Sequence, residues 1–475
     1  MIMRKTKIVC TLGPACIEES VIEAMLKNGM NIARFNFSHG THEYHKKVMD
    51  TFRRVRDRLQ LPAGVMLDTK GPEIRLGDFE NGKICLHKGD SFTLTAKECL
   101  GNEKMAYMTF PDLPRQVYAG VRILLDDGKV AMTVTECNES EICCRVDVGG
   151  VLSNHKSINI PNFHIDMPYL SDKDEADLIF GIEQDVDFIA ASFVRCKEDV
   201  IKLRRFLDYH GGHSIKIISK IENIEGINNF EEILNHSDGI MVARGDMGVE
   251  VEFERLPGLQ KRFIRKCYQS GKMVITATQM LESMIHASTP TRAEITDVAN
   301  AVFDGTSAVM LSGETATGDH PALVVKVMAQ IAEQAENDAF DMDIYQGIKY
   351  DSDMADVTNA ICDAAATTAR DVHAKVIIAV TTSGLTARRV SKFRPPQMIV
   401  AATPEIKTFH QLSLSWGVIP VLALHQNNTD DLFVHAIDCA KQNDLVSRGD
   451  KAVITAGVPL NLEGTTNLLK VQIVN

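Results

Sequence analysis

Two stretches of the chain place charged side chains directly after short apolar runs. The first run ends in Lys220 and Glu222, and the second ends in Arg244 and Asp246. Short runs rich in β-branched residues are typical of strands buried on both faces, and the two-residue period of a strand puts each charged pair on one face. Two carboxylates with open coordination positions suit Mg²⁺ and a phosphorylated ligand. A surface cluster of salt bridges is the alternative interpretation.

The segment between the two runs predicts a β-α-β unit. Ile224 to His236 has helical spacing, and Asp238-Gly239 is a stop signal for a helix. Two strands joined by one helix are expected to be parallel neighbours whose C-terminal ends lie side by side. The charged residues of both strands should therefore meet at one edge of the sheet.

The same pattern of an apolar run ended by polar residues recurs along the chain. The runs begin near residues 7, 31, 65, 187, 215, 239, 273 and 308. Eight such units predict a closed (β/α)8 TIM barrel, and active sites of these barrels lie at the C-terminal ends of the strands.

The interval after the third run is too long for one repeat. Residues 73–166 instead contain short alternating runs with Gly and Asp turn signals, which predict an inserted, small β-barrel-like lid domain. The remaining 1–72 and 167–337 amount to roughly 240 residues, close to the ~250 of a typical barrel. After a polar linker, expected at Asp338 to Asp353, residues 338–475 predict a C-terminal open α/β domain with a regulatory role.

Composition narrows the function classes. The chain has 475 residues, enough for several cores. No apolar run approaches the ~18 residues that span a bilayer, and the N-terminus does not resemble a signal peptide, so we expect no membrane association. Eleven cysteines without a C-x-x-C pair predict reduced thiols in a cytoplasmic protein. The formal net charge of −12 argues against nucleic-acid binding.

The barrel rule turns the residues that end the strands into a candidate site. Carboxylates suit a divalent metal, cations suit phosphate, and Asn, Ser and Thr oxygens suit a monovalent cation. The residues are Arg34, Asn36, Ser38, His39, Asp68, Thr69, Lys70, Lys220, Glu222, Arg244, Asp246, Thr278 and Ser312. Phosphoryl transfer uses this combination, because its catalysis is mostly positioning and charge neutralisation.

At these residues the chain resembles pyruvate kinases over almost its whole length. The matching stretches are residues 33–40 (ARFNFSHG), 67–75 (LDTKGPEIR), 218–223 (ISKIEN), 241–246 (MVARGD), 276–284 (TATQMLESM), 290–294 (PTRAE) and 310–314 (MLSGE). The resemblance is to bacterial members without an extra C-terminal domain. It implies an allosteric, homotetrameric enzyme of glycolysis that transfers the phosphoryl group of phosphoenolpyruvate to ADP, giving pyruvate and ATP.

The resemblance also implies roles for single residues. Mg²⁺ or Mn²⁺ would be held by Glu222 and Asp246. K⁺ would be held by Asn36, Ser38, Asp68 and Thr69. The catalytic residues would be Lys220, Arg34, Thr278 and Ser312, and the residues that bind phosphoenolpyruvate would be Arg34, Lys220, Gly245, Asp246 and Thr278. The nucleotide contacts would be Asn36, Phe37, Ser38, His39, Arg75 and Lys156.

The chain departs from the usual family pattern close to one of these residues. Relatives often read Lys-Gly-Val-Asn-Leu-Pro-Gly where this chain has residues 156–162, so that Ser157 and Asn162 replace two glycines. Because glycine is the most flexible residue, this replacement is expected to stiffen the hinge beside Lys156.

A second candidate site lies in the C-terminal part of the chain. A strand over residues 375–380, a hydroxyl-rich loop and the start of a helix predict an anion-binding turn, with a simple helix N-cap as the alternative. The loop resembles the sugar-bisphosphate loop of regulated pyruvate kinases. The implied effector residues are Thr381, Thr382, Ser383, Gly384 and Thr386. We expect fructose 1,6-bisphosphate before ribose 5-phosphate, with residues 457–467 closing over the sugar.

Two other functions were weighed against this one. A Mg²⁺-dependent pyruvate-enolate aldolase or lyase would have no need for a nucleotide-covering domain or for the monovalent-cation residues. A catalytically silent metabolite sensor would be expected to lose Lys220 or a metal carboxylate, and this chain keeps all of them.

Overall fold

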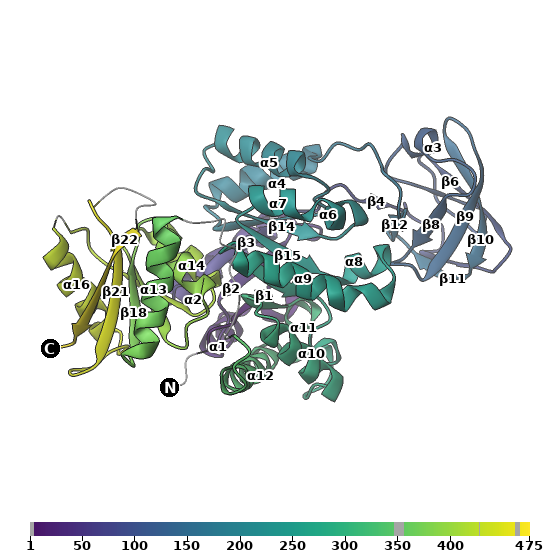
Figure 1. Cartoon of the computed structure of the whole chain (residues 1–475). Coiled ribbons are helices and arrows are strands. Elements are labelled where there is room, and N and C mark those ends of the chain that lie inside the picture. Colours follow the sequence, from purple (N-terminus) through teal and green to yellow (C-terminus); the bar gives the residue numbers. More distant parts are fainter. Residues whose placement is uncertain (1–3, 346–355, 427, 461–465) are drawn as a thin grey trace.

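The centre of the computed structural model, which describes residues 4–345, 356–426, 428–460 and 466–475, is a closed barrel of eight parallel strands (Figure 1). Around the barrel the strands follow the order β1-β17-β16-β15-β14-β13-β3-β2. Their bounds are β1 (Lys7–Thr11), β2 (Ile32–Asn36), β3 (Gly64–Asp68), β13 (Phe188–Ala191), β14 (Lys216–Ile221), β15 (Gly239–Ala243), β16 (Met273–Ala277) and β17 (Ala308–Leu311). All eight predicted strands, and the TIM-barrel fold class, are confirmed.

Helices surround the barrel and bury their apolar faces against the strands. Their bounds are α1 (Glu19–Lys27), α2 (His42–Arg58), α4 (Asp172–Glu183), α5 (Lys197–Tyr209), α6 (Ile224–Asn228), α7 (Phe230–His236), α8 (Arg244–Glu250), α9 (Leu256–Gln269), α10 (Arg292–Phe303), α11 (Gly313–Ala316) and α12 (Pro321–Asp341). The start of α10 is set by a capping box, in which Thr291 and Glu294 each accept a backbone N–H of the other.

The prediction of one helix over residues 224–236 was wrong. The segment forms α6 and α7, which meet at Asn229. The amide of Asn229 donates to the carbonyl of Arg195, 2.9 Å away, and its backbone lies at φ −93° and ψ 14°, outside the helical region. A long-range hydrogen bond therefore interrupts a segment whose local pattern favours a continuous helix.

The predicted linker also begins too early. The helix α12 continues to Asp341, because Ala339 is buried in a cluster with Tyr345 and Trp416. Tyr345 donates a hydrogen bond to the carbonyl of Val302 at 2.7 Å. Residues 346–355, which include the rest of the predicted linker, lie outside the described residues.

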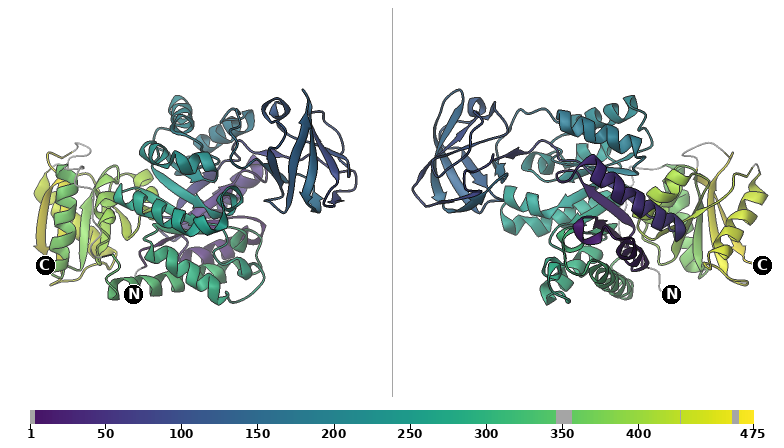
Figure 2. Two further views of the ribbon diagram at one scale, coloured as in Figure 1. Left: turned by 45° about the vertical axis from the view of Figure 1, so that its right-hand side comes forward. Right: turned by 180° about the vertical axis from the view of Figure 1, so that it is seen from behind.

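A β-rich segment is inserted between β3 and β13. It forms a seven-stranded sheet in the order β4-β12-β8-β9-β10-β6-β7 and a second sheet of β5 and β11. The bounds are β4 (Ile74–Arg75), β5 (Lys83–Leu86), β6 (Ser91–Thr95), β7 (Met105–Tyr107), α3 (Leu113–Gln116), β8 (Arg122–Leu125), β9 (Val130–Cys137), β10 (Glu141–Val148), β11 (Gly150–Ser153) and β12 (Ser157–Asn159). In all views it projects from one end of the barrel (Figure 2). We call this segment the lid.

The C-terminal elements form an open sheet in the order β20-β19-β18-β21-β22, parallel except for β22. The bounds are α13 (Val357–Asp371), β18 (Val376–Val380), α14 (Leu385–Lys392), β19 (Met398–Thr403), α15 (Ile406–Gln411), β20 (Val418–Leu422), α16 (Thr429–Gln442), β21 (Lys451–Gly457) and β22 (Thr466–Ile473). Helices α13 and α14 pack on one face with Ile377, and α16 packs on the other face with Ile378. The predicted open α/β domain is confirmed.

The C-terminal domain contacts the N-terminal end of the barrel strands, opposite the lid, through α15 and the residues after α14 (Figure 1). Lys407 pairs with Asp185 at 2.6 Å, and Gln411 donates to the carbonyl of Asp187, just before β13. Arg394 donates to the carbonyl of Gly305 at 2.6 Å, before β17. The C-terminal domain and the C-terminal ends of the barrel strands therefore lie at opposite ends of the barrel.

The structure also addresses the expectations about membrane spans and about cysteines. No helix in the described part of the chain is long and apolar enough to cross a membrane. All eleven cysteines are free thiols.

Candidate active site

Lys220 lies at the C-terminal end of β14, and its ammonium group contacts three oxygens. These are Asp68 Oδ1 at 3.1 Å, Ser192 Oγ at 2.8 Å and Glu222 Oε1 at 2.9 Å. An ammonium group has three N–H donors, so all three are engaged. Burial by itself would lower the pKa of Lys220, but the charges of Asp68 and Glu222 outweigh it and raise that pKa, so the side chain is firmly cationic.

Asp68 joins two cations from different strands. Its Oδ2 accepts a 2.6 Å hydrogen bond from Nε of Arg34, whose Nη1 donates to Thr11 Oγ1 at 2.8 Å. Burial would raise the pKa of Asp68, but Arg34 and then Lys220 lower it below its usual value. The predicted phosphate-binding cations are therefore held together by one carboxylate.

Glu222 is almost fully buried and carries the features of a metal ligand. Burial raises its pKa to about 7, the charge of Lys220 opposes that rise, and the charge of Asp246 adds to it. The backbone N–H of Phe193 donates to Oε2 at 2.6 Å. A carboxyl group that burial drives toward its neutral form is held ionised by a bound cation, and two hard oxygen ligands fit Mg²⁺.

The chain supplies only part of a coordination shell there. Within the described ranges, no group of three or more His, Cys, Asp or Glu side chains could hold a metal ion. A divalent cation held by Glu222 and Asp246 alone would need further oxygen ligands from bound molecules or water.

The prediction that Arg244 and Asp246 continue a strand was wrong. The strand β15 ends at Ala243 and α8 begins at Arg244, so the two-residue period no longer applies. Arg244 pairs with Asp297 at 2.7 Å and donates to the carbonyl of Thr278 at 2.5 Å. It therefore braces a neighbouring turn, and it does not join the cluster around Lys220.

The turn that Arg244 supports holds Thr278 in a rare backbone conformation. Its φ is +68°, which is sterically costly for a β-branched residue and is typical of functional sites. Thr278 Oγ1 accepts the N–H of Gly245 at 2.8 Å and donates to the carbonyl of Ala277 at 2.6 Å. Thr278 and the start of α8, to which the family resemblance assigns substrate binding, are thereby brought together.

Ser312 follows β17, the strand next to β16. Its N–H donates to Glu314 Oε2 at 2.7 Å, while its buried Oγ has no hydrogen-bond partner within the described residues. A buried hydroxyl without a hydrogen-bond partner is uncommon in proteins, which makes Ser312 Oγ a candidate contact for a bound molecule.

The residues predicted to hold K⁺ end two adjacent strands. Asn36 and Asp68 are register partners on β2 and β3. Asn36 Oδ1 accepts the N–H of Ser38 at 3.1 Å, and Thr69 Oγ1 accepts the N–H of Ser192 at 3.1 Å. These are hard oxygens of the kind that bind alkali cations, although hydrogen bonds already occupy part of them.

The residues predicted to contact nucleotide lie on both sides of the hinge between barrel and lid. The pairing of β4 with β12 places Arg75 opposite Ser157, next to Lys156. Arg75 forms a bidentate pair with Glu73 at 2.6 and 2.9 Å, and Lys156 pairs with Asp126 at 2.9 Å. Both cations are therefore present near the hinge with local acidic partners.

Two predicted nucleotide contacts on the barrel differ in exposure. The Phe37 ring is 2% exposed and stacks on His45 with centroids 4.2 Å apart, so the ring is not placed to contact a ligand. His39 is exposed, and its carbonyl accepts a hydrogen bond from His45 at 2.8 Å.

The substituted glycine positions in the hinge are accommodated by the fold. Asn162 has φ +58°, a left-handed conformation that Asn adopts more readily than other residues with a side chain. Ser157 lies in β12, and its hydroxyl donates to Asp127 at 2.8 Å. A cavity of about 160 Å³ opens between lid and barrel, and its lining includes Arg75, Asp246 and Glu250.

The sequence-based site omitted two residues. Ser192 contacts Lys220, Asp68 and the carbonyl of Thr69, and it follows the apolar run of β13 just as the selected residues follow theirs. Glu250 accepts a 3.5 Å hydrogen bond from Asn159 of the lid, and burial raises its pKa to about 7. Glu250 is the last residue of α8, between Val249 and Val251, so the rule that selected residues at strand ends does not reach it.

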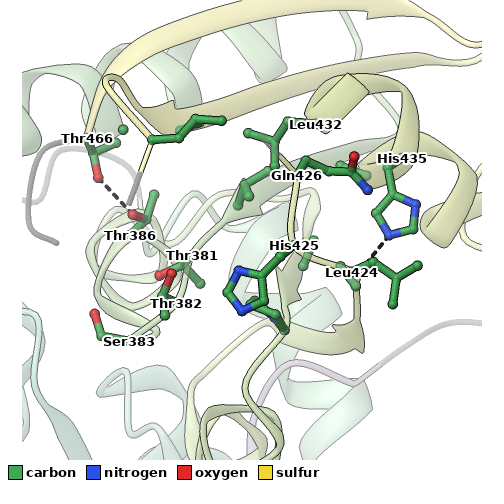
Figure 3. Close-up of a pocket in the computed structure, with 18 of the residues that line it drawn as sticks. Thr381, Thr382, Ser383, Thr386, Leu424, His425, Gln426, Leu432, His435 and Thr466 are labelled. Carbon is green, nitrogen blue, oxygen red and sulfur yellow. Dashed lines mark hydrogen bonds between the residues drawn. The ribbon is translucent and has the colours of Figure 1, made fainter. Parts of the chain in front are cut away.

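The C-terminal loop that was predicted to bind an effector borders a cavity of about 200 Å³ (Figure 3). Thr381 Oγ1 accepts the N–H of Gly384, which has φ +79°. Thr386 shares a 2.8 Å hydrogen bond with Thr466 at the start of β22. Residues 461–465 of the second predicted loop lie outside the described residues.

Comparisons with known proteins agree with this arrangement. Residues 3–325 match the family model "Pyruvate kinase, barrel domain", and residues 359–472 match "Pyruvate kinase, alpha/beta domain". The pyruvate kinase of Clostridium acetobutylicum is 45% identical over 99% of this chain and 100% of its own length, and that of Staphylococcus haemolyticus is 48% identical over 99% and 81%. A crystal structure of a pyruvate kinase from Cryptosporidium parvum superimposes with a TM-score of 0.93 at 40% identity, covering 99% of this chain and 96% of the other. The chain belongs to the pyruvate kinase family of phosphotransferases.

Proposed function

We propose that this chain transfers the phosphoryl group of phosphoenolpyruvate to ADP, giving pyruvate and ATP. The observation that carries this proposal is the cluster in which Lys220 and Arg34 contact Asp68, and Lys220 also contacts Glu222, at the C-terminal ends of the barrel strands. Such a cluster opposes the strong mutual repulsion of several phosphates and a carboxylate held in one pocket.

Lys220 and Arg34 would stabilise the charge that develops on the transferring phosphoryl group. Both are held in place before substrate binds, since Asp68 contacts each of them, and preorganised charge needs no reorganisation during the reaction. A divalent cation held by Glu222 and Asp246 would neutralise phosphate charge and help align the reactants. Because Lys220 also donates to Glu222, a cation on Glu222 would compete for that contact and leave an N–H for a phosphoryl oxygen.

The substrate carboxylate would lie at the start of α8. There the backbone N–H groups of Gly245 and Asp246 and the hydroxyl of Thr278 are close together, and Arg244 supports the turn from behind. Ser312 on the neighbouring strand offers a buried hydroxyl with no hydrogen-bond partner among the described residues, which suits a role near the face where the enolate is protonated.

The remaining assignments follow the same division of the chain. We assign residues 1–72 and 167–337 to catalysis, 73–166 to covering the nucleotide and 338–475 to regulation. K⁺ would lie at Asn36, Ser38, Asp68 and Thr69. ADP would contact Asn36, Ser38, His39, Arg75, Lys156 and the backbone of Phe37.

Regulation and assembly form part of the proposal. A phosphorylated sugar would bind the loop of Thr381 to Thr386 and favour one arrangement of domains or subunits. A homotetramer is supported by the edge strand β22 and by exposed apolar side chains such as Phe253. The eleven free thiols suit a cytoplasmic, glycolytic enzyme.

The decisive experiment is turnover with phosphoenolpyruvate, ADP, Mg²⁺ and K⁺, with pyruvate followed by coupled reduction. Pyruvate formation that requires both substrates and yields one ATP per pyruvate is the expected result. Pyruvate formed by cleavage of an aldol substrate without ADP would identify a lyase instead. Binding of phosphoenolpyruvate without any turnover would identify a sensor.

A further inference from the structure

The turns that follow β2 and β3 are both held by the start of α4. Lys173 donates to the carbonyl of Phe37 at 2.8 Å, and the backbone N–H of Gly71 donates to Oδ1 of Asp174 at 3.0 Å. Phe37 directly follows β2, and Gly71 lies shortly after the end of β3. The start of one helix therefore contacts both of the turns to which K⁺ is assigned, although the whole lid separates that helix from them in the sequence.

The hydrogen bond from Lys173 fixes one particular peptide group. The carbonyl of Phe37 and the N–H of Ser38 belong to the same peptide, and that N–H donates to Oδ1 of Asn36 at 3.1 Å. Because a peptide group is planar, anchoring its oxygen also sets the direction of its N–H. Asn36 and Ser38 are both proposed K⁺ ligands. The placement of their oxygens therefore depends on a lysine that belongs to neither turn.

A buried carboxylate holds Lys173 in place. Asp177 is 2% exposed, its Oδ2 accepts a 2.6 Å hydrogen bond from Lys173, and its Oδ1 lies 2.6 Å from Nε2 of His42 at the start of α2. The His42 ring stacks on Phe180 of α4 with centroids 4.5 Å apart. A lysine and an aspartate one helical turn apart usually form a solvated surface pair that contributes little to stability. This pair instead links α4 to both ends of the turn between β2 and α2.

Asp174 fixes the turn after β3 in a similar way. Its Oδ2 accepts the N–H and the hydroxyl of Ser171 at 3.1 and 2.6 Å, in the capping box that starts α4. Its Oδ1 is left for Gly71, which has φ +72° and packs so closely on Ser192 that an added Cβ would lie 2.8 Å from the Ser192 Cβ. Ser192 in turn contacts Lys220, so this turn reaches the candidate active site.

We propose that Lys173 is a positioning residue for the monovalent-cation site, held in place by Asp177, while Asp174 fixes the second turn of that site. Lys173 touches neither substrate nor K⁺ and acts through the peptide between Phe37 and Ser38. The inference rests on the proposed function and adds residues to its K⁺ site. Ligands that are already in position bind more tightly, because no ordering cost is paid on binding. The affinity for K⁺, and not the chemical step, should therefore depend on Lys173.

The charge of Lys173 makes the test sharp, because charge and positioning have opposite effects. If Lys173 acted on the site only through its charge, Lys173→Met would strengthen K⁺ binding, since two cations repel each other. If Lys173 positions the peptide, the same change weakens K⁺ binding in spite of the lost repulsion. Lys173→Arg keeps both the charge and N–H donors, so it should restore most of the affinity that the methionine variant loses.

The test is turnover of phosphoenolpyruvate and ADP against K⁺ concentration, with tetramethylammonium keeping the ionic strength constant. Lys173→Met should raise the K⁺ concentration for half-maximal rate by about tenfold, the worth of one charge-assisted hydrogen bond, while saturating K⁺ recovers most of kcat. Asp172→Asn is the matched control, since it changes an exposed charge in the same turn of α4, and it should keep the K⁺ dependence of the parent. An unchanged or lower half-maximal concentration in Lys173→Met would overturn the inference.

Thermal unfolding without substrates gives a second readout that does not require turnover. Replacing tetramethylammonium by K⁺ should raise the melting temperature of the parent, because an ion that binds only the folded state stabilises it. This increase should be smaller in Lys173→Met and close to that of the parent in Lys173→Arg. A methionine variant that melts at a lower temperature in both salts, yet keeps the full increase with K⁺, would show that Lys173 only stabilises the fold and would contradict the positioning role.

The parent protein separates this inference from the proposed function. Turnover with the same K⁺ dependence in the parent and in Lys173→Met would overturn the inference and leave the catalytic proposal intact. A parent without turnover would overturn the catalytic proposal, whereas a K⁺-induced rise in melting temperature that Lys173→Met loses would still support the role of Lys173. A parent that responds to K⁺ in neither measurement would rule out the K⁺ site and the inference with it.

Discussion

Lys220 and Glu222 form a 2.9 Å ion pair although both side chains are almost completely buried. Lys220 lies in β14 and Glu222 is the first residue after it, and the 2.9 Å contact shows that both side chains leave on the same side. A buried charge that loses its partner destabilises a protein by roughly 3–5 kcal/mol. Removing either member of this pair would therefore leave the other as an unpaired buried charge and destabilise the site.

Lys220→Met is expected to lower kcat by several orders of magnitude, because the transferring phosphoryl group loses its preorganised cation. The large barrel core should keep the fold, with a lower melting temperature because Asp68 and Glu222 lose a shared partner. The rate of pyruvate formation measures the loss of kcat. Circular dichroism measures the fold and the melting temperature, and Mn²⁺ binding measures whether the metal site is retained. Lys216→Met is the matched control on the same strand, and turnover of the Lys220 variant within tenfold of the parent would remove Lys220 from the mechanism.

Activity is expected to require K⁺, because the oxygens at the ends of β2 and β3 suit a monovalent cation. Glu73→Lys should relax this requirement by placing a fixed cation on the segment that follows β3. Glu73 forms a bidentate pair with Arg75, so Glu73→Gln is the control that frees Arg75 without adding a cation. Turnover rates of the parent and both variants in K⁺ and in tetramethylammonium test this requirement. Equal rates for the parent in both salts would contradict the K⁺ site.

The interface between barrel and C-terminal domain is expected to weaken in mild acid because of His410. Burial, and then the charge of Arg56, lowers the pKa of His410 to about 4, and its Nδ1 has no hydrogen-bond partner within the described residues. Between pH 6.5 and 4 the unfolded chain therefore binds more protons than the folded one, and stability falls as pH falls. The loss attributable to this residue is about 2 kcal/mol between pH 7 and pH 5.

Thermal unfolding of the parent and of His410→Gln at both pH values measures this effect. The drop in melting temperature from pH 7 to pH 5 should be smaller in the variant, since glutamine does not titrate. His213→Gln, at an exposed position, should keep the full drop. Identical pH dependence in all three proteins would show that His410 is protonated equally in both states.

The protein is expected to be a homotetramer in which β22 takes part in an interface. This edge strand exposes Val471 by 43% and Ile473 by 58%, and open edges with apolar side chains pair readily with another copy. Val471→Glu should lower the mass measured by light scattering at micromolar concentration, whereas Gln472→Glu on the other face should lower it less. A parent protein that scatters as a monomer would rule out the tetramer.

The positions of the strands and of the residues that end them could be predicted from the sequence. Each barrel strand is a short apolar run buried on both faces, and this pattern can be recognised from the local sequence alone. Because parallel strands of a barrel end on the same rim, the run of polar residues after each strand was sufficient to select Lys220, Glu222, Asp68 and Thr278. The family stretches supported the same selection.

Which of those residues contact one another was decided only by the tertiary structure. Arg244 ends a strand like the others, yet the helix that starts there turns it toward Asp297 and the Thr278 carbonyl. Ser192 meets Lys220 because β13 and β14 pair in register, although 28 positions separate the two residues in the chain. The periodicity of the sequence determines the face on which a side chain leaves its own strand. The residues that this side chain then contacts depend on barrel closure and on how the backbone turns after the strand, and these are non-local properties.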